Sequence, residues 1–582
     1  MTPLDLIRAF ETLADAEGGT DRLRELVLQL AVRGKLVAQD ASDEPASVLL
    51  TRIAAEKARL VKEKKIRKAK PLPPIEADEV PFSVPEGWEW ARVASLGDVI
   101  RGVTYKKEQA ADSSAAERVK LLRAHNIQRS IDLHKLVYVP RELVKANKYL
   151  RQGDILFCIA SGSVRLVGKS SRVATDMDAT FGAFTAIVRP FERETSEYIK
   201  LFTHSPAGRA LLIDEGQGIA IKNLKTTALA ALPLPLPPLA EQHRIVAKVD
   251  ALMGLLDRLE AAREARDGTR TSLRDSALSA LADAEDAASV ETAWTRMSAQ
   301  MDELFTDPSD VAPLRQTIVD LASLGRLTPR GVDDRTAAEE ISRIRERHRA
   351  AWIGRYGTRK TYVAPESIGE DEFPQLPASW RWERLGLLGV NLLNPVQTGP
   401  FGSKLKNHEF VDTGVPVIAV GNLTPHGFQV DNKYFVSPHK AEELSDYDVH
   451  YGDVLFARTG ATLGKVCVAP DFVRDWRMSS HILRVRMNRD VLLPELVVLW
   501  LYGAAAVKGQ IADRVRGMSR PGFNTTLLCE IAVPIPPLAE QHRIVAKVDA
   551  LMALCDDLEA RLTAAKTTRG AFAAAAVHHL DA

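Results

Sequence analysis

The sequence predicts a mixed α/β fold in two tandem modules, each with a domain of strands and helices flanked by helical segments. The main support is a repeat, because PPLAEQHRIVAKVDALM occurs at residues 237–253 and again, without a change, at 536–552. Further landmarks recur at similar offsets: Trp88 and Trp90 return as Trp380 and Trp382, and GDILF at 153–157 returns as GDVLF at 452–456. A period of roughly 300 residues is far longer than a solenoid repeat, so each copy is a complete module.

Length and composition agree with several folded units. The 582 residues would fill about four domains, and 46% hydrophobic with 26% charged residues is ordinary globular composition, which excludes a disordered or fibrous chain. The formal net charge is +1, so any signal for nucleic acid must be local. Cys158, Cys467, Cys529 and Cys555 have no CxxC spacing, which argues against disulfides and zinc. Without a membrane-length apolar run or a signal peptide, we expect a cytoplasmic protein and no membrane partner.

The elements of the first module follow from residue spacing. Val48, Leu49, Ile53 and Leu60 have helical spacing over 45–69, and the prolines at 71–74 end the helix. Short apolar runs split by Gly, Asp and Pro then predict strands and turns. We therefore expect five regions: an N-terminal helical region at 1–79, a mixed domain at 80–236, a central helical spacer and linker at 237–372, a second mixed domain at 373–535, and a C-terminal helical spacer at 536–582.

The repeated segment itself predicts a long helix in each module. Its apolar residues step alternately by four and three positions, which is the seam of a coiled coil. The predicted helix interface consists of Ile245, Val249, Leu252 and Leu256 in the first copy and Ile544, Val548 and Leu551 in the second.

No motif in the chain predicts catalysis. GSVRLVGKS at 162–170 is similar to a phosphate-binding loop but has one residue too many between its glycines. HExxH, GxSxG and convincing metal-ligand clusters are absent from the sequence, and PDFVRDW at 470–476 lacks the Glu-x-Lys of a nuclease. A non-catalytic protein is therefore favoured. The alternatives are a stand-alone P-loop ATPase or nuclease, and a coiled-coil scaffold with no DNA role.

Glycine-rich loops with basic and amide side chains are the strongest functional signal. They lie at 101–107, 161–169, 399–406, 457–465 and 514–524. Lysine and arginine bind phosphates, and arginine, lysine and asparagine also read base edges, so such loops suit a DNA groove. The candidate DNA-binding residues are Tyr105, Lys106, Lys107, Ser161, Ser163, Arg165, Lys169, Lys222 and Asn223 in the first module, and Ser403, Lys404, Lys406, Arg458, Thr459, Lys465, Arg516, Arg520 and Asn524 in the second.

Two basic runs at matching positions add a weaker signal. Residues 52–70 hold nine basic and two acidic side chains, and residues 335–360 hold eight and three. A run of charge is more often a solvated face than a binding site, but a matched pair could follow DNA phosphates.

In combination, GPFGSKLK at 399–406, GDVLFARTGATLGK at 452–465 and the proline-rich step into the repeated helix resemble the specificity subunit of Type I restriction-modification enzymes. The resemblance implies two target-recognition domains, separated by long antiparallel coiled-coil-like helices in a pseudo-two-fold tandem repeat. It implies binding to a bipartite site in double-stranded DNA, with no metal and no catalytic residue in this chain. RGVTYKK at 101–107 departs from the GPFGS form, as expected of a domain that reads a different half-site.

Partners and cofactors are implied by the same resemblance. Two modification (methyltransferase) subunits would methylate adenine with S-adenosylmethionine, and restriction (translocase/endonuclease) subunits would use ATP and Mg²⁺. The exact repeat offers its own argument for a duplicated partner, because it includes Glu241, Arg244 and Lys248, which we expect to face outward from the helix. Recent recombination restricted to this segment is the alternative explanation.

Overall fold

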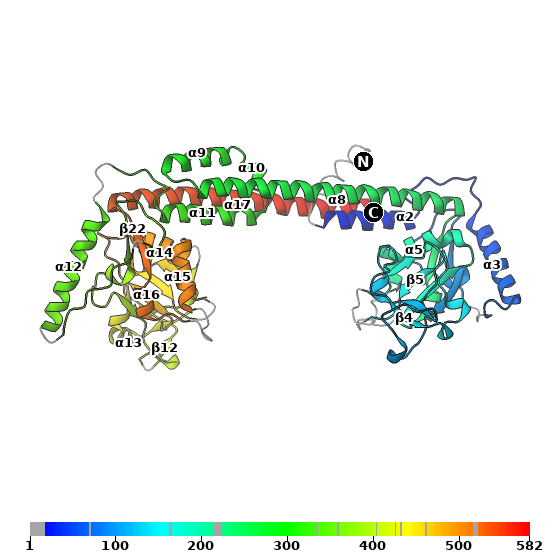
Figure 1. Cartoon of the computed structure of the whole chain (residues 1–582), viewed down its shortest axis with the longest axis horizontal. Coiled ribbons are helices and arrows are strands. Elements are labelled where there is room, and N and C mark those ends of the chain that lie inside the picture. Colours follow the sequence, from blue (N-terminus) through cyan, green and yellow to red (C-terminus); the bar gives the residue numbers. More distant parts are fainter. Residues whose placement is uncertain are drawn as a thin grey trace. The chain divides into compact units, whose positions relative to one another are not determined.

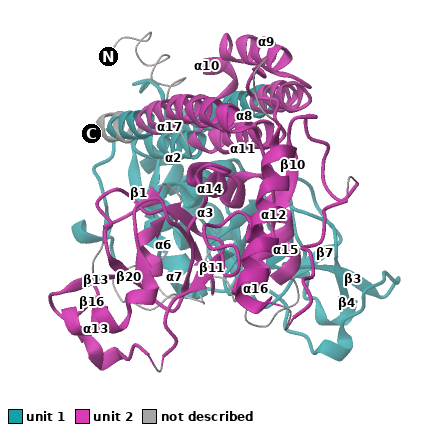
Figure 2. Ribbon diagram, turned by 90° about the vertical axis from the view of Figure 1, so that its left-hand side faces the viewer, with its two compact units in different colours: residues 1–266, 567–582 teal, residues 267–566 magenta. Residues whose placement is uncertain are grey.

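The computed structural model describes residues 18–68, 72–161, 166–212, 224–331, 336–357, 360–369, 371–402, 404–424, 427–430, 433–459, 462–515 and 522–581. The chain forms two compact units (Figure 2). Unit 1 comprises Met1–Arg266 with Thr567–Ala582, and unit 2 comprises Asp267–Lys566. The division falls inside two long helices, α8 and α17, of 44 residues each. Each unit is described by itself.

Unit 1 contains a four-stranded antiparallel sheet of order β2-β8-β5-β6, a three-stranded sheet β4-β3-β7 and the pair β1-β9. In chain order its elements are α2 (Gly19–Val32), α3 (Ala46–Lys62), β1 (Glu89–Arg92), α4 (Val93–Leu96), β2 (Gly97–Arg101), β3 (Arg118–Leu122), β4 (Val137–Pro140), β5 (Ile155–Cys158), β6 (Ser170–Arg172), β7 (Ala179–Phe181), β8 (Thr185–Pro190), α5 (Ser196–His204), α6 (Pro206–Leu212), α7 (Thr226–Ala231), β9 (Pro233–Leu236) and the first part of α8 (Leu239–Ala282).

Unit 2 contains a matching four-stranded sheet of order β11-β21-β18-β19, a five-stranded sheet β12-β16-β13-β20-β17 and the pairs β10-β22 and β14-β15. After the end of α8 its elements are α9 (Ala287–Ser298), α10 (Met301–Leu304), α11 (Val311–Ser323), α12 (Ala337–Tyr356), β10 (Arg381–Arg384), β11 (Val396–Thr398), β12 (Phe410–Val411), β13 (Val415–Ile418), β14 (Leu423–Thr424), β15 (Gly427–Phe428), β16 (Phe435–Val436), α13 (Pro438–Glu443), β17 (Asp448–Val449), β18 (Val454–Ala457), β19 (Val466–Val468), β20 (Trp476–Met478), β21 (Ile482–Val485), α14 (Pro494–Gly503), α15 (Ala505–Val515), α16 (Thr525–Cys529), β22 (Ala532–Ile535) and α17 (Leu538–Asp581).

The two units repeat one plan, which confirms the predicted mixed fold and tandem duplication. In each four-stranded sheet the central strand after the Gly-Asp turn, β5 or β18, pairs antiparallel with β8 or β21. In each unit a short pair, β1-β9 or β10-β22, closes the domain directly before its long helix. β5 and β18 are buried along their whole length, which is why each reads as a continuous apolar run.

The predicted helix over 45–69 is shorter in the structure. α3 ends at Lys62, and Lys64 has a positive φ of 55°, a left-handed conformation that stops a helix. Several of the basic residues in the 52–70 run therefore lie beyond the helix, and the run is not one helical face.

The predicted seam of each long helix is largely buried. Ile245, Val249 and Leu256 are buried, Leu252 is half-buried, and Ile544, Val548 and Leu551 are buried. Ile245 and Val249 share a core cluster with residues of α2 and of the first mixed domain. Ile544, Val548 and Leu551 share theirs with α11, the counterpart of α2, and with the second mixed domain. Each seam thus also anchors its helix to the domain that precedes it.

The end of α8 lies within unit 2 and contacts α17 there. Within unit 2, Figure 1 shows the end of α8 beside α17. Leu281, in the last turn of α8, and Leu551, in the first third of α17, line one small cavity and belong to one core cluster. This contact is the one that an antiparallel arrangement of the two helices requires.

Among the described residues no single helix is long and apolar enough to span a membrane. The bent pair α14 and α15 passes that test jointly, with a bend of 63°. In α14, Leu496, Val497 and Trp500 are buried in the core of unit 2.

Candidate nucleic-acid interface

Three loops of unit 2 meet at one end of its four-stranded sheet. Arg458, which follows β18, donates from Nη1 to Thr398 Oγ1 at the end of β11, 2.9 Å away. The backbone N–H of Arg458 donates to the carbonyl of His481, directly before β21, at 3.0 Å. Thr459 Oγ1 lies 3.0 Å from His481 Nδ1. We call Thr398, Arg458, Thr459 and His481 the unit 2 sheet-end cluster.

The backbone around this cluster is tightly fixed. Gly399 donates to the carbonyl of Ile482 at 3.1 Å, and a Cβ on Gly399 would lie 2.0 Å from the carbonyl oxygen of Ser479, so only glycine fits. Phe523 donates its backbone N–H to the carbonyl of Arg458 at 2.8 Å. The structure therefore brings together parts of three predicted loops, 399–406, 457–465 and 514–524, which lie far apart in the sequence.

The guanidinium of Arg458 uses only some of its N–H donors in hydrogen bonds within the protein. Its Nε is buried and has no partner among the described residues, while the side chain as a whole stays half-buried. A buried unpaired donor is costly unless a ligand or water satisfies it. The guanidinium of Arg458 also carries other N–H donors, and such donors suit a base edge or a phosphate.

The remaining described candidates of unit 2 differ in their surroundings. Lys404 is exposed, with Nζ 5.3 Å from the centre of the Tyr447 ring, and Lys406 is exposed. Lys465 is half-buried beside the end of β18, where its carbonyl accepts from Ala457 N–H at 2.8 Å. Asn524 caps α16, because its Oδ1 accepts from Leu527 N–H at 2.8 Å. Asn524 therefore has a structural role that the sequence did not predict.

Unit 1 builds the same sheet end with apolar side chains. The backbone N–H groups of Ile159 and Ala160, which follow β5, donate to the carbonyl of Phe184 at 3.0 and 3.1 Å. Leu224 donates to the carbonyl of Ile159 at 2.7 Å, as Phe523 does to Arg458 in unit 2. Gly102 again leaves no room for a Cβ, which would lie 2.1 Å from the carbonyl oxygen of Gly182. We call Ile159, Ala160 and Phe184 the unit 1 sheet-end cluster.

The described candidates of unit 1 also differ in their surroundings. Tyr105 is half-buried against a small apolar cluster, so part of its role is packing. Lys106 and Lys107 are exposed, and Ser161 is half-buried. Lys169 Nζ donates to Gln128 Oε1 at 2.6 Å, which joins it to a neighbouring loop. Ser163, Arg165, Lys222, Asn223, Ser403, Arg516 and Arg520 lie outside the described residues.

The sequence reasoning missed the loop at 123–135. This loop surrounds an open hollow of about 480 Å³ lined by Arg123, His125, Gln128, Asp132, His134 and Lys135. Asn126, fully buried, organises the loop: its Nδ2 donates to the carbonyls of Asp132 and His134 at 2.8 and 3.0 Å. Asn422 occupies the equivalent place in unit 2 and donates to the carbonyl of Gln429 at 3.0 Å. The sequence signal that could have revealed this loop was the asparagine that recurs in both modules.

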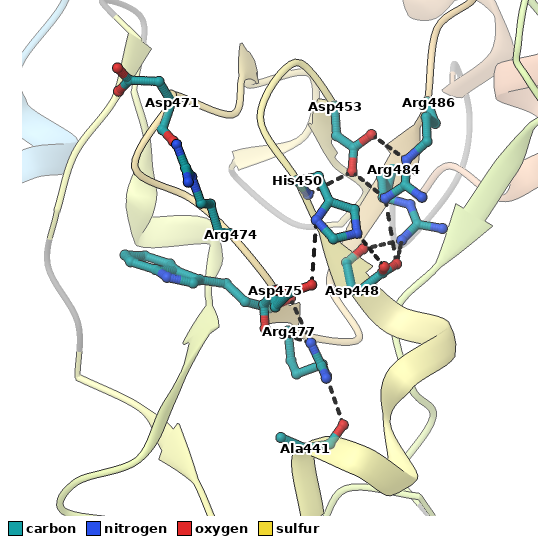
Figure 3. Close-up of polar contacts among 11 residues, drawn as sticks. Ala441, Asp448, His450, Asp453, Asp471, Arg474, Asp475, Arg477, Arg484 and Arg486 are labelled. Carbon is teal, nitrogen blue, oxygen red and sulfur yellow. Dashed lines mark hydrogen bonds and ion pairs between the residues drawn. The ribbon is translucent and has the colours of Figure 1, made fainter. Parts of the chain in front are cut away.

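Asp448, His450 and Asp475 are the ligand types of a metal site, but their surroundings argue for an ion-pair network (Figure 3). His450 Nε2 lies 2.5 Å from Asp448 Oδ2, and Arg484 also binds Asp448. Burial would raise the pKa of the Asp448 carboxyl, but the charges of Arg484 and Arg486 outweigh it and hold that pKa below its ordinary value. The two guanidinium groups thus already supply the positive charge that a cation would bring.

The neighbouring pair shows that this network is structural. Arg486 binds the buried Asp453 through two contacts of 2.8 Å. In unit 1 the equivalent Arg189 binds the buried Asp154 through two contacts of 2.7 Å. Because both units keep this pair at the turn that leads into β5 or β18, it braces the strand that carries the sheet-end cluster.

The repeated helix corrects one prediction. Glu241 does not point outward: it is 1% exposed, and Trp88 Nε1 donates to its Oε2 at 2.9 Å. In unit 2, Trp380 Nε1 donates to Glu540 Oε2 at the same distance. The error arose because Trp88 lies far from Glu241 in the sequence and no spacing shows their contact. Much of the repeat's identity is therefore explained by packing inside each unit.

Some identical residues remain unexplained by packing. Arg244 is only half-buried and binds Asp43 at 2.6 Å, whereas Lys248 is exposed. In the helical part of the repeated segment, six exposed residues of the first copy recur in the second without a change of residue type: Ala240, His243, Ala247, Lys248, Asp250 and Ala251 recur as Ala539, His542, Ala546, Lys547, Asp549 and Ala550, of which Lys547 is half-buried. Four of these positions, spaced at three- and four-residue steps, lie along one face of each helix.

Comparison with known proteins places both mixed domains in one family. The family described as Type I restriction modification DNA specificity domain matches residues 85–266 and 400–565. The chain is 28% identical to the Type I restriction enzyme EcoAI specificity subunit of Escherichia coli, covering 95% of this chain and 92% of that protein. It is 29% identical to the EcoEI specificity subunit of Escherichia coli, with the same coverage. A crystal structure of the HsdS subunit from Thermoanaerobacter tengcongensis aligns with a TM-score of 0.41 and 18% identity, over 85% of this chain and 97% of that one.

Proposed function

The chain belongs to the Type I restriction modification DNA specificity family, and on this premise we propose that it recognises a bipartite site in double-stranded DNA. As the specificity subunit of a Type I restriction-modification system, it would direct adenine methylation or cleavage by partner subunits. The observation that carries the proposal is the pair of sheet-end clusters, which share one backbone frame and differ in side chains. A shared backbone arrangement with different side chains would allow the two domains to recognise two different half-sites.

We propose that the chain has no catalytic centre of its own. Its relatives are specificity subunits, and the segment that is similar to a phosphate-binding loop supports no ATPase: Ser170 is buried and bonds to Thr203 and His204 instead of offering a hydroxyl to a metal. The alternatives of a stand-alone ATPase or nuclease and of a scaffold without a DNA role are therefore set aside. S-adenosylmethionine, ATP and Mg²⁺ would be bound by the partners, in the cytoplasm.

The partners that we propose are two modification subunits, joined by restriction subunits for cleavage. The support is the exposed identical face of the two helices, which packing within the units does not require. A shared face would let two copies of one subunit dock in the same way, one on each helix.

Sequencing of methylated bases tests the proposal most simply. Cells with the gene should contain a split motif with a methylated adenine in each half, and deletion of the gene should abolish methylation at that motif. The purified chain alone should bind a duplex with this motif but should neither methylate nor cleave it. A methylation pattern that ignores the deletion, or methyl transfer by the chain alone, would overturn the proposal.

A further inference from the structure

Phe184 is an apolar side chain held rigidly in solvent at the end of the unit 1 sheet. The residue is 69% exposed, more than any other large apolar residue among the described residues of unit 1. It lies in the tight turn between β7 and β8, where Thr185 donates to the carbonyl of Gly182 through both its N–H and its hydroxyl, each at 2.8 Å. The exposure is therefore not that of a frayed loop.

Bonds from three other segments fix this turn. Gly182 donates to the carbonyl of Leu122 at 3.0 Å, and Gly102 donates to the carbonyl of Thr185 at 3.0 Å. Arg101 Nε donates to the carbonyl of Ala183 at 3.2 Å. The Phe184 carbonyl itself accepts from Ile159 and Ala160. None of these bonds uses the phenyl ring, so the fold fixes the backbone and leaves the side chain to the solvent.

His481 occupies the same position in unit 2. Ser479 donates to the carbonyl of Ile418 as Gly182 does to Leu122, and Gly399 donates to the carbonyl of Ile482 as Gly102 does to Thr185. The carbonyl of His481 accepts from Arg458 as that of Phe184 accepts from Ile159. His481 is exposed, and Thr459 Oγ1 lies 3.0 Å from its Nδ1. Thr459 thereby orients the ring, and no described residue bonds to Nε2.

Phe184 is apolar and His481 is polar, and the edges of bases likewise have apolar and polar groups. A phenyl group can contact the methyl group of thymine in the major groove, whereas an oriented imidazole forms a hydrogen bond with a polar base edge. We propose that residues 184 and 481 are specificity-determining positions of the two domains, with Phe184 contacting a thymine methyl group and His481 a polar base edge. This inference rests on the proposed function and deepens it by naming what each position recognises.

The test compares thymine with uracil, which lacks only the methyl group. The full-length chain is titrated with duplexes of the methylated motif in which each thymine is replaced in turn by uracil. One buried methyl group corresponds to about a fourfold change in affinity. Replacement of one particular thymine, in one half-site, should therefore lower the affinity of the chain for the duplex about fourfold. Phe184→Ala should bind the thymine and uracil duplexes equally at that position, and Phe184→Leu should regain part of the preference.

A control separates this contact from general surface effects. Val48→Ala removes another exposed apolar group of unit 1, 45% exposed on α3, and should keep the full thymine preference. Phe184 fills no core space, so its replacement should not unfold unit 1. If no thymine of either half-site distinguishes the wild-type chain from Phe184→Ala, the inference is wrong.

His481→Phe tests the second position. It should change the preferred base at one position of the other half-site and leave the Phe184 half-site unaltered. An unaltered motif would contradict the role of His481. These outcomes differ from a failure of the proposed function, in which the wild-type chain itself would bind no duplex with sequence preference.

Discussion

Comparison of the two sheet ends shows how one backbone arrangement can support two different DNA specificities. In unit 1 the strand β5 continues into Ile159 and Ala160, which are apolar, whereas in unit 2 the equivalent β18 continues into Arg458 and Thr459. Most of the backbone bonds at these positions recur: the N–H groups of Ile159 and Arg458 donate to the carbonyls of Phe184 and His481, and their own carbonyls accept from Leu224 and Phe523. Because the bonds depend only on N–H and carbonyl groups, the side chains are free to change without loss of the fold.

The largest effect should come from making the unit 2 sheet end resemble that of unit 1. Arg458→Ile places in unit 2 the residue found at the equivalent position of unit 1. It removes the bond to Thr398 and a charged donor, so binding should weaken by about 1–3 kcal/mol and specificity should relax in one half-site only. Titration with labelled duplexes measures both effects.

The control for Arg458→Ile is Arg489→Ala. Arg489 is exposed beyond β21, away from the end at His481, and its loss should leave binding unchanged. Equal losses of DNA affinity for the two variants would mean that the sheet end is not the DNA-binding surface. The difference between the two sheet ends would then have no bearing on DNA recognition.

Low pH should destabilise unit 1 more than unit 2. Burial, assisted by the charge of Lys200, lowers the pKa of His204 to about 4, although a bond to the carbonyl of Ser170 opposes the shift. The unfolded chain then binds this proton at higher pH than the folded one, so unit 1 should lose up to roughly 3 kcal/mol as pH falls from 6.5 to about 4.

Hydrogen exchange measured for each unit between these pH values checks this loss. In unit 2, α14 has no histidine, so this unit should lack the contribution. His204→Asn should remove this loss of stability from unit 1. A variant as acid-sensitive as the wild type would show that another group is responsible.

A smaller effect is expected from a phosphate contact in unit 2. Lys404→Ala removes an exposed charge from the loop after β11, so affinity should fall nearly equally for all sequences. The slope of log affinity against log salt should decrease by about 1. Lys508→Ala, an exposed lysine on α15, is the matched control. A change of sequence preference with an unchanged salt slope would instead make Lys404 a base-reading residue.

The smallest effect concerns the buried carboxyl group that supports unit 1. Burial raises the pKa of Glu241, although the bonds from Trp88 and Gln39 oppose the shift. A carboxyl with a raised pKa stabilises the fold most at low pH, and this contribution is lost as pH rises through the folded pKa. Glu241→Gln keeps an acceptor for Trp88 and should flatten this loss, with a small gain in the free energy of unfolding at neutral pH.

Unfolding of Glu241→Gln across pH, beside the exposed Asp250→Asn on the same helix, measures this gain. Strong destabilisation by the glutamine would instead mean that the charge of Glu241, and not its hydrogen bonds, holds Trp88.

The parts of the fold that depend on local pattern were predictable from the sequence. The repeat showed the two modules, and the steps of four and three from Ile245 and Ile544 showed the buried helix faces. Contacts between distant residues were not predictable. Glu241 is buried because Trp88 reaches it, and Phe184 lies beside Ile159 because two strands end together; no spacing in the sequence contains either fact.

The candidate site was predictable only as a set of loops. Glycine-rich segments with Arg458 and Thr459 pointed to the sheet end at which three of the predicted loops meet, because glycine permits close approach and arginine suits DNA. The importance of His481 and Phe184 was missed, since neither belongs to a basic loop. Asn126 and Asn422, which shape another loop in each unit, lacked any charge signal.

Exchange of one domain tests the central claim most directly. Residues 384–533 are replaced by the equivalent domain of a related specificity subunit, and the methylated bases of the host are sequenced. If each unit reads its own half-site, one half of the split motif should change completely and the other half should remain. If both halves change together, or neither does, the two sheet ends are not independent readers and the account is contradicted.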